Sequence, residues 1–191
     1  GAKIKYFSPL KGEEVPLDAD GLYLGGGFPE EFAAELSGNM GAIKSIRTFI
    51  EKGMPTLAEC GGFMFLSKSI ETTSGETHQM AGIIPGRIKM QKKLAALGYR
   101  EITGTPGNFL INEIEQAKGH EFHYSTFEAD EDLTHAYQAK GRFGSKQEGC
   151  VLGNLVAGYT HFHFASNPTL AKNWINACLK RKNRSAHETI N

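Results

Sequence analysis

The chain has 191 residues, of which 40% are hydrophobic, and this is enough for one domain with a buried core. Its 21 Lys and Arg balance its 21 Asp and Glu, so no net positive charge favours nucleic acid or anionic lipid. Apolar runs such as Phe63–Leu66 are far shorter than the roughly 20 residues of a membrane span. Three scattered Cys and the lack of a signal peptide favour a reducing compartment. The composition therefore predicts a cytoplasmic protein that binds neither nucleic acid nor membranes.

The first 70 residues alternate between apolar strand patterns and helical periodicity. Strands are predicted at Ile4–Phe7, Gly21–Gly25 and Pro55–Ala58. Helical spacing is predicted to run from Pro29 to Gly53 with a break at Ser37–Asn39, and again from Gly62 to Ile70. This alternation predicts an α/β fold with a mainly parallel sheet and helices on both faces.

The second half of the chain is richer in strand patterns. Runs separated by turn residues predict an antiparallel extension of the sheet, at Gly82–Met90, Leu97–Ile102 and Glu121–Phe127. Further strands are expected at Cys150–Leu152, Leu155–Ala157 and Tyr159–Phe164. A last helix is predicted to begin after Asn167-Pro168, and the polar residues 181–191 are expected to form a frayed tail.

Cys60 lies between a predicted strand and a predicted helix, followed by Gly61 and Gly62. A sharp strand–turn–helix connection of this kind exposes a nucleophile, and small neighbours allow the turn. The start of the following helix is expected to lower the thiol pKa. The alternative is an inert cysteine of the core.

His161 and His163 lie in Tyr159-Thr-His-Phe-His-Phe164, where strand alternation places both imidazoles on one face. One of them could take a proton from the Cys60 thiol. The alternatives are a metal site that also uses His120 and His123, although no carboxylate or Cys completes a ligand spacing, and a structural histidine pair.

Two further segments are rich in candidate functional groups. Gly25–Gly27 follow a predicted strand but lack the Lys-Ser/Thr of a phosphate loop, so their N–H groups are candidates for holding an oxyanion, and a simple turn is the alternative. In His120–Ser125, alternation separates His120 and Tyr124 from His123 and Ser125, and a solvated strand edge is the alternative.

Four motifs, in this order, cover most of the chain: L-G-G-G-F-P-E at 24–30, A-E-C-G-G-F-M-F-L at 58–66, G-H-E-F-H-Y-S at 119–125 and G-Y-T-H-F-H-F at 158–164. With these motifs the chain resembles the class I glutamine amidotransferase domains of the cobyrinic acid type. The resemblance implies a flavodoxin-like glutaminase fold over residues 1–180, lacking its first strand and helix, and an unpaired sheet edge that promotes self-association.

The resemblance also implies roles for individual residues. Cys60 is implied as the nucleophile that forms a thioester with glutamine, and His161 as its partner. His163 stands where other class I amidotransferases carry a Glu that orients the histidine. The N–H groups of Gly26 and Gly61 are implied as the oxyanion hole. The residues implied to line the glutamine pocket are Gly25, His123, Tyr124 and Ser125.

By the same resemblance, the ammonia serves ATP-dependent amidation of the a and c side-chain carboxylates of cobyrinate in cobalamin biosynthesis. The synthetase domain that binds ATP, Mg²⁺ and the corrinoid is outside these residues, and no metal or cofactor is expected within them. Alternatives are a related amide synthase of the cobyric acid or nickel-sirohydrochlorin type, and a non-catalytic docking domain of the same fold.

Overall fold

Three sheets organise residues 1–188, which are the residues described by the computed structural model. The helices are η1 (Pro9–Lys11), η2 (Pro29–Phe32), α1 (Ala33–Gly38), α2 (Met40–Glu51), α3 (Gly61–Leu66), η3 (Phe164–Ser166) and α4 (Thr169–Glu188). The strands are β1 (Leu22–Leu24), β2 (Thr56–Glu59), β3 (Ser67–Glu71), β4 (Thr77–Gln79), β5 (Ile84–Met90), β6 (Ala96–Gly104), β7 (Gln116–His123), β8 (Ser125–Ala129), β9 (Tyr137–Gly141), β10 (Gly144–Glu148), β11 (Cys150–Leu152), β12 (Leu155–Gly158) and β13 (His161–His163).

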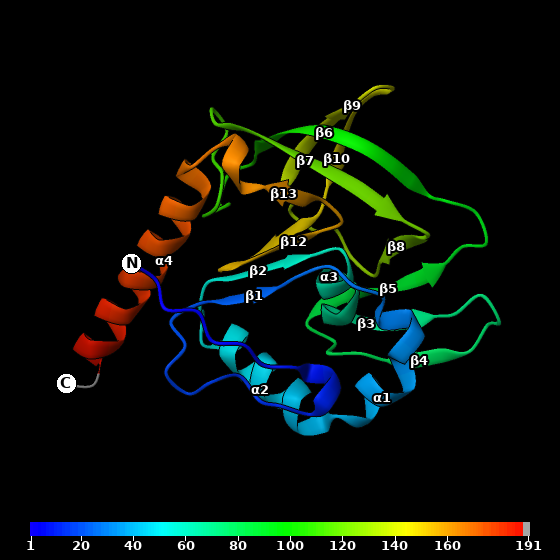
Figure 1. The fold of residues 1–191 in the computed structure, drawn as a ribbon, viewed down its shortest axis with the longest axis horizontal. Helices are drawn as coiled ribbons and strands as arrows, with labels where there is room; N and C mark the ends of the chain where they lie inside the picture. Colours follow the sequence, from blue (N-terminus) through cyan, green and yellow to red (C-terminus); the bar gives the residue numbers. More distant parts are fainter. Residues whose placement is uncertain (189–191) are drawn as a thin grey trace.

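The central sheet has the order β1-β2-β12-β11, in which the first three strands are parallel and β11 is antiparallel. Its side chains alternate between two hydrophobic clusters. Ala58 and Leu155 face the cluster that includes Ile46 of α2, whereas Leu57 faces the cluster beneath β6 and β7. Figure 1 shows α2 on one side of this sheet and the long strands β6 and β7 on the other.

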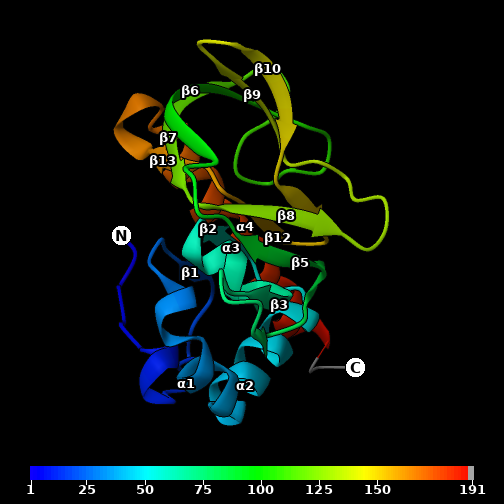
Figure 2. The same ribbon diagram turned by 90° about the vertical axis from the view of Figure 1, so that its right-hand side faces the viewer.

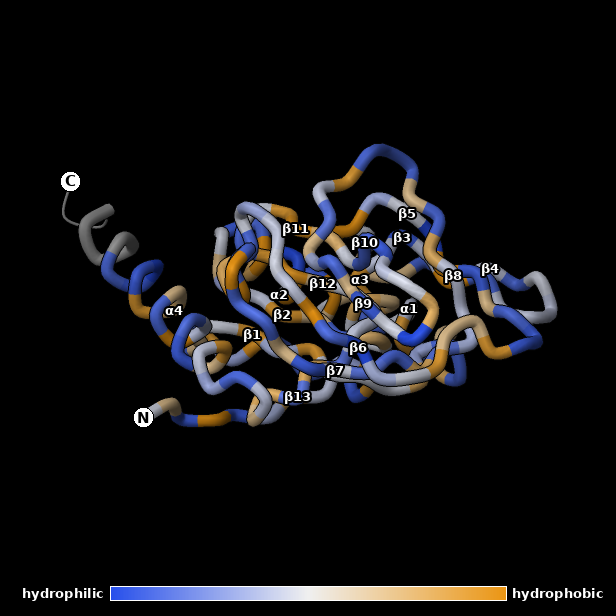
Figure 3. The backbone as a smooth tube through the Cα atoms, turned by 90° about the horizontal axis from the view of Figure 1, so that it is seen from above, coloured by the Kyte–Doolittle hydropathy of each residue, from blue (hydrophilic) through white to orange (hydrophobic). Residues whose placement is uncertain are grey.

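The predicted antiparallel extension forms a five-stranded sheet of order β10-β9-β6-β7-β13. A third sheet, β4-β3-β5-β8, adjoins the central sheet through α3, as Figure 2 shows. The start of α4 is fixed by the fully buried Leu170, and the helix then leads away from the sheets (Figure 3). The predicted α/β class, with its parallel sheet and antiparallel extension, is confirmed. The second face of the parallel sheet is covered by a sheet together with α4 rather than by helices alone.

Several predicted elements differ from the structure. The single strand predicted at Glu121–Phe127 is divided between β7, which ends at His123, and β8, which begins at Ser125 in another sheet. Residues 4–7 are not a strand: Ile4 and Tyr6 are exposed, and Lys5 pairs with Asp18 instead of joining the free edge of β1. The helix after Cys60 ends at Leu66 rather than Ile70, because Ser67 adopts an extended backbone and its hydroxyl bonds the Met64 carbonyl.

The frayed tail expected from residue 181 is also wrong for the part of it that the structure describes. The helix α4 continues to Glu188, since Arg, Lys, Ala and Glu are good helix formers and extend an existing helix at little cost. Residues 189–191 of the expected tail lie outside the described residues. Within residues 1–188, no helix has the length and apolar character that crossing a membrane requires.

Candidate active site

The turn between β2 and α3 carries Cys60 in a strained conformation. With φ 47° and ψ −104°, Cys60 is the only non-glycine residue with positive φ among residues 1–188. Its N–H donates to the Gly158 carbonyl of β12 (2.8 Å), and its own carbonyl accepts the N–H of Met64 (2.9 Å). Such strain persists only where surrounding contacts enforce it and is concentrated at functional sites. The local prediction of a nucleophile turn therefore agrees with the backbone geometry.

The glycine loop Gly25–Gly27 lies directly on the start of α3. The Gly62 N–H donates to the Gly25 carbonyl (3.0 Å). A Cβ on Gly62 would overlap the Leu24 carbonyl, and one on Gly61 would lie 2.7 Å from the Gly27 nitrogen. Both positions therefore require glycine, and the close approach places the loop beside Cys60.

The strand β13 brings His161 to the same loop. A Cβ on Gly26 would overlap Cε1 of His161, so the imidazole rests against the bare backbone of Gly26. On its other side the ring stacks on His120 of β7, with centroids 4.7 Å apart and planes 9° apart. The Cys60 thiol lies 4.0 Å from the Phe122 carbonyl, also of β7. The turn, the glycine loop and β13 thus converge on one place.

The protonation states of the two groups are set mainly by burial. Burial raises the pKa of the Cys60 thiol, the Gly61 N–H lowers it, and the carboxyls of Glu30, Glu59 and Glu148 raise it, which together bring this pKa to about 11. The expected lowering of this pKa by the helix start is therefore wrong, because the buried surroundings disfavour a thiolate more than one turn of helix favours it. Burial, and then His120, lower the pKa of His161. A neutral thiol beside a neutral imidazole needs a proton transfer before it can attack.

Two backbone N–H groups are available to hold a negatively charged oxygen. That of Gly26 makes no hydrogen bond to another described residue, and that of Gly61 faces the Cys60 sulfur. They come from the two glycine segments that meet beside the thiol. This arrangement suits the oxyanion of a tetrahedral intermediate.

In the segment 123–125, His123 and Ser125 point to the buried side of the chain and Tyr124 points to the opposite side. His123 is buried, donates from Nδ1 to the Ser125 carbonyl (2.8 Å) and stacks on Tyr159, while its Nε2 is buried without a partner. Burial lowers the pKa of His123. Ser125 Oγ is hydrogen-bonded to the Tyr159 hydroxyl (2.9 Å), whereas Tyr124 points away and packs edge-on against Phe122.

The side chain of His163 is exposed on β13 and forms no hydrogen bond or ion pair with another described residue. Among the side chains that the structure describes, those of residues 1–183, no group of three or more His, Cys, Asp or Glu could hold a metal ion. The rings of His120 and His161 lie face to face, which does not direct their nitrogens at a common ion.

Two buried carboxylates next to the site were missed by the sequence analysis. Glu59 accepts the N–H of Phe162 (2.9 Å) and the hydroxyl of Tyr23 (2.6 Å). Glu148 accepts the N–H of Tyr159 (2.6 Å) and the hydroxyl of Thr160 (2.9 Å). Burial raises the pKa of both carboxyls, that of Glu148 to about 7. The sequence shows a Glu directly before Cys60, but it does not show the contact of this Glu with Phe162, which is 103 positions away.

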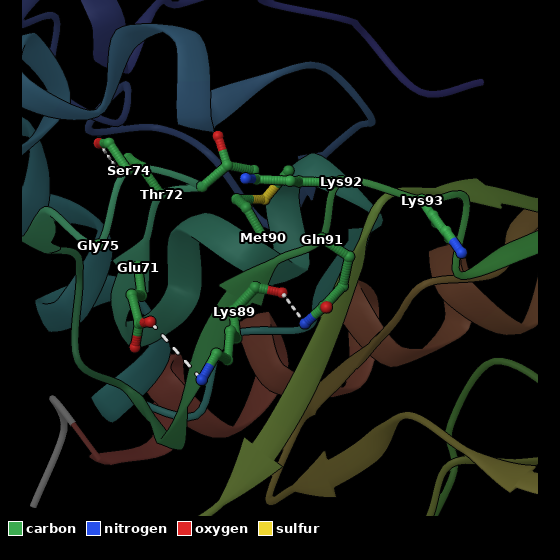
Figure 4. A pocket seen from close by; sticks show the side chains of 10 residues that line it. Glu71, Thr72, Ser74, Gly75, Lys89, Met90, Gln91, Lys92 and Lys93 are labelled. Atoms are coloured by element: carbon green, nitrogen blue, oxygen red, sulfur yellow. Dashed lines mark hydrogen bonds and ion pairs between the residues drawn. The ribbon is translucent and has the colours of Figure 1, made fainter.

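Two hollows lie outside this core. A groove of about 1430 Å³ follows the free edge of β1 between the first residues and Trp174 of α4, and it reaches the glycine loop and Gly61. Self-association through this edge stays a prediction. A smaller hollow of about 560 Å³ lies between the β3–β4 turn and residues 89–93, where Lys89 is paired with Glu71 (Figure 4). None of the predicted site residues lines this smaller hollow.

Comparison with solved structures shows the fold. The chain is similar to a glutamine amidotransferase from Thermotoga maritima, with a TM-score of 0.56, 20% identity and coverage of 98% of this chain and 74% of that one. It is also similar to PurLQS from Thermotoga maritima, with a TM-score of 0.59, 14% identity and coverage of 88% of this chain and 82% of that one.

Comparison with curated sequences gives nearer relatives. Cobyrinate a,c-diamide synthase from Priestia megaterium is 57% identical over 97% of this chain and 41% of the relative, and that from Thermoplasma volcanium is 41% identical over 94% and 39%. The chain thus spans about two fifths of the length of these relatives. Residues 1–169 match the model of the CobB/CobQ-like glutamine amidotransferase domain. The chain therefore belongs to the CobB/CobQ-like glutamine amidotransferase family.

Proposed function

We propose that the chain hydrolyses glutamine to glutamate and ammonia through a thioester on Cys60. The observation that carries this proposal is the convergence of a strained, buried cysteine, a neutral imidazole and two glycine turns. His161 takes the thiol proton, and the sulfur attacks the side-chain amide carbon of glutamine. The N–H groups of Gly26 and Gly61 stabilise the resulting oxyanion.

The second half of the reaction releases both products. His161 returns the proton to the leaving nitrogen as the C–N bond breaks, so ammonia departs and the γ-glutamyl thioester remains. Water, deprotonated by His161, then attacks the thioester, glutamate leaves, and the thiol is restored. Gly25, His123 and Ser125 are proposed to line the glutamine pocket, to which Tyr124, whose side chain points to the other face, contributes only its backbone. The buried Nε2 of His123 offers an unused acceptor for a substrate N–H.

The destination of the ammonia is inferred from the relatives. The name cobyrinate a,c-diamide synthase and the length of these relatives suggest a synthetase domain in the same parent chain. We infer that this domain binds ATP, Mg²⁺ and the corrinoid and uses the ammonia to amidate the a and c carboxylates of cobyrinate. A cytoplasmic location is consistent with the three free cysteines.

Two other functions make different predictions. A related tetrapyrrole amide synthase, of the cobyric acid or nickel-sirohydrochlorin type, would share the glutaminase step and differ only in the acceptor that consumes ammonia. A non-catalytic docking domain would keep the fold without reacting with glutamine. Incubation with a glutamine-like diazoketone, followed by peptide mapping, separates an enzyme from a docking domain, since only the enzyme forms a Cys60 adduct.

The roles of the two histidines can be tested with a matched pair of variants. His161→Ala should abolish thioester formation, because it removes the base, while His163→Ala should only weaken it, because His163 is exposed and without a described partner. Glutamate release and the rate of Cys60 labelling measure both. An active His161→Ala and an inactive His163→Ala would reverse the assignment.

A further inference from the structure

No side chain hydrogen-bonds to His161 to fix its orientation within the described residues. Its ring has only a stacking contact with His120 and a packing contact with Gly26. His163, the residue expected to orient it, is exposed. The position of His161 must therefore be set through its backbone.

Glu59 contacts the backbone on one side of His161. It is the residue before the nucleophile, is 2% exposed, and accepts the N–H of Phe162, the next residue after His161. Its other oxygen accepts the hydroxyl of Tyr23, which reaches it from β1. A carboxylate held at both oxygens cannot rotate, so it fixes Phe162 relative to Cys60.

Glu148 contacts the backbone on the other side. This carboxylate, at the end of β10, accepts the N–H of Tyr159 and the hydroxyl of Thr160, the residue before His161. A Cβ on Gly158 would lie 2.7 Å from its Oε1, so the segment follows the carboxylate closely. Gly158 in turn accepts the Cys60 N–H.

We propose that Glu59 and Glu148 are positioning residues that hold the backbone on both sides of His161 and thereby set its place beside Cys60. The inference rests on the proposed glutaminase function of this site. Because each carboxyl is bonded at both of its oxygens, its orientation is fixed, which suits the pair to hold a base to within the fraction of an ångström that proton transfer requires.

The first test removes the donors that anchor the carboxylates while conserving volume. Tyr23→Phe deletes one bond to Glu59, and Thr160→Val deletes one bond to Glu148. Each should lower kcat for glutamine hydrolysis roughly three- to tenfold with KM unchanged, because only the base is displaced. Matched controls are Tyr99→Phe and Thr73→Val, two exposed residues outside the site, which should keep wild-type kcat.

The second test asks whether the acceptor atoms matter. Glu59→Ala should lower kcat on the order of a hundredfold, because nothing then holds Phe162. Glu59→Gln should recover it to within about threefold, since the amide oxygen can accept from Phe162 and the amide NH₂ can donate to the Tyr23 oxygen. A purely structural role would lower the unfolding temperature without this rescue of kcat at constant KM.

The outcomes separate this inference from the proposed function. Failure of the wild-type chain to form a Cys60 adduct with the glutamine-like diazoketone would overturn the proposed function. A wild-type adduct together with wild-type kcat in Tyr23→Phe and Thr160→Val would overturn the inference alone. These two variants keep their volume, so they decide the question even if Glu59→Ala does not fold.

Discussion

Cys60 and Cys150 are both buried, and burial raises the pKa of both thiols, to about 11 and about 12. Cys150 begins β11, pairs regularly with Ala157 and is enclosed by the core. Cys60 has positive φ and precedes Gly61, which lines the groove together with the glycine loop. Burial alone therefore does not decide which cysteine reacts. An access path, a neighbouring base and free N–H groups make the difference.

Replacing each cysteine by alanine should give the largest contrast between the two regions. Cys60→Ala removes the proposed nucleophile, so glutamate release should fall on the order of a thousandfold or more. Cys150→Ala removes only a buried sulfur, so turnover should stay within about twofold while stability falls by about 1–2 kcal/mol. Glutamate release and urea unfolding measure the pair. Comparable turnover in both variants would show that the reaction depends no more on Cys60 than on Cys150.

Gly26→Ala tests whether the bare backbone of the loop is needed. The new Cβ would overlap Cε1 of His161, and the ring would have to move from the loop. We expect kcat to fall about a hundredfold, with the protein still folded because a side chain rather than backbone gives way. Gly38→Ala is the control, since a Cβ there meets no atom within 4 Å, and it should leave kcat unchanged. An active Gly26→Ala variant would argue against the assigned position of His161.

The sequence predicted the parts of this region that depend on neighbours in the chain. The glycines after Cys60 and the alternation around Phe162 are local signals, and both elements form, although α3 ends at Leu66 and β13 spans only His161–His163. Ile4–Phe7 was misassigned because its short apolar run has no partner strand in the structure, and Ser67–Ile70 was misassigned because the helical spacing of Ile70 was followed across polar residues that belong to β3. Their state depends on whether a partner strand is present.

Contacts between distant residues could not be predicted in this way. The Cys60 thiol is buried in part by Phe122, 62 positions away, so the direction of its pKa shift followed from packing rather than from the turn. Glu59 reaches Phe162 across 103 positions. Nothing in a single sequence marks a glutamate as buried when most glutamates are exposed.

Alkylation with iodoacetamide, which carries no glutamine-like group, compares the ionisation and accessibility of the Cys60 and Cys150 thiols. Because the pKa of Cys60 is about 11, its thiolate fraction is small at pH 7, and its alkylation rate should rise about tenfold from pH 7 to pH 8. Cys150 should react only on unfolding, since it is enclosed. Mass spectrometry of each peptide follows the rates. A Cys60 rate that is constant between pH 6 and pH 9 would instead indicate a stable thiolate.

Glu148 links the two regions, because its charge raises the pKa of both Cys60 and Cys150. Burial, and then Glu121, raise its own pKa from 4.5 to about 7, against the opposing effects of Tyr159, Thr160 and Lys146. The folded state thus binds a proton that the unfolded state releases. Its stabilising contribution is complete below about pH 4.5 and is lost as the pH rises through 7.

Glu148 therefore predicts a difference in pH dependence between the wild type and a variant that does not titrate at this position. Relative to Glu148→Gln, which does not titrate, the wild-type free energy of unfolding should fall between pH 5 and pH 8 by up to about 3 kcal/mol. Urea unfolding of both proteins at several pH values measures this difference, which cancels the titrations that they share. Glu113→Gln, at an exposed carboxyl, should follow the wild type. Parallel curves for wild type and Glu148→Gln would show that the carboxyl is ionised throughout, and then its charge would act on both cysteines at every pH in this range.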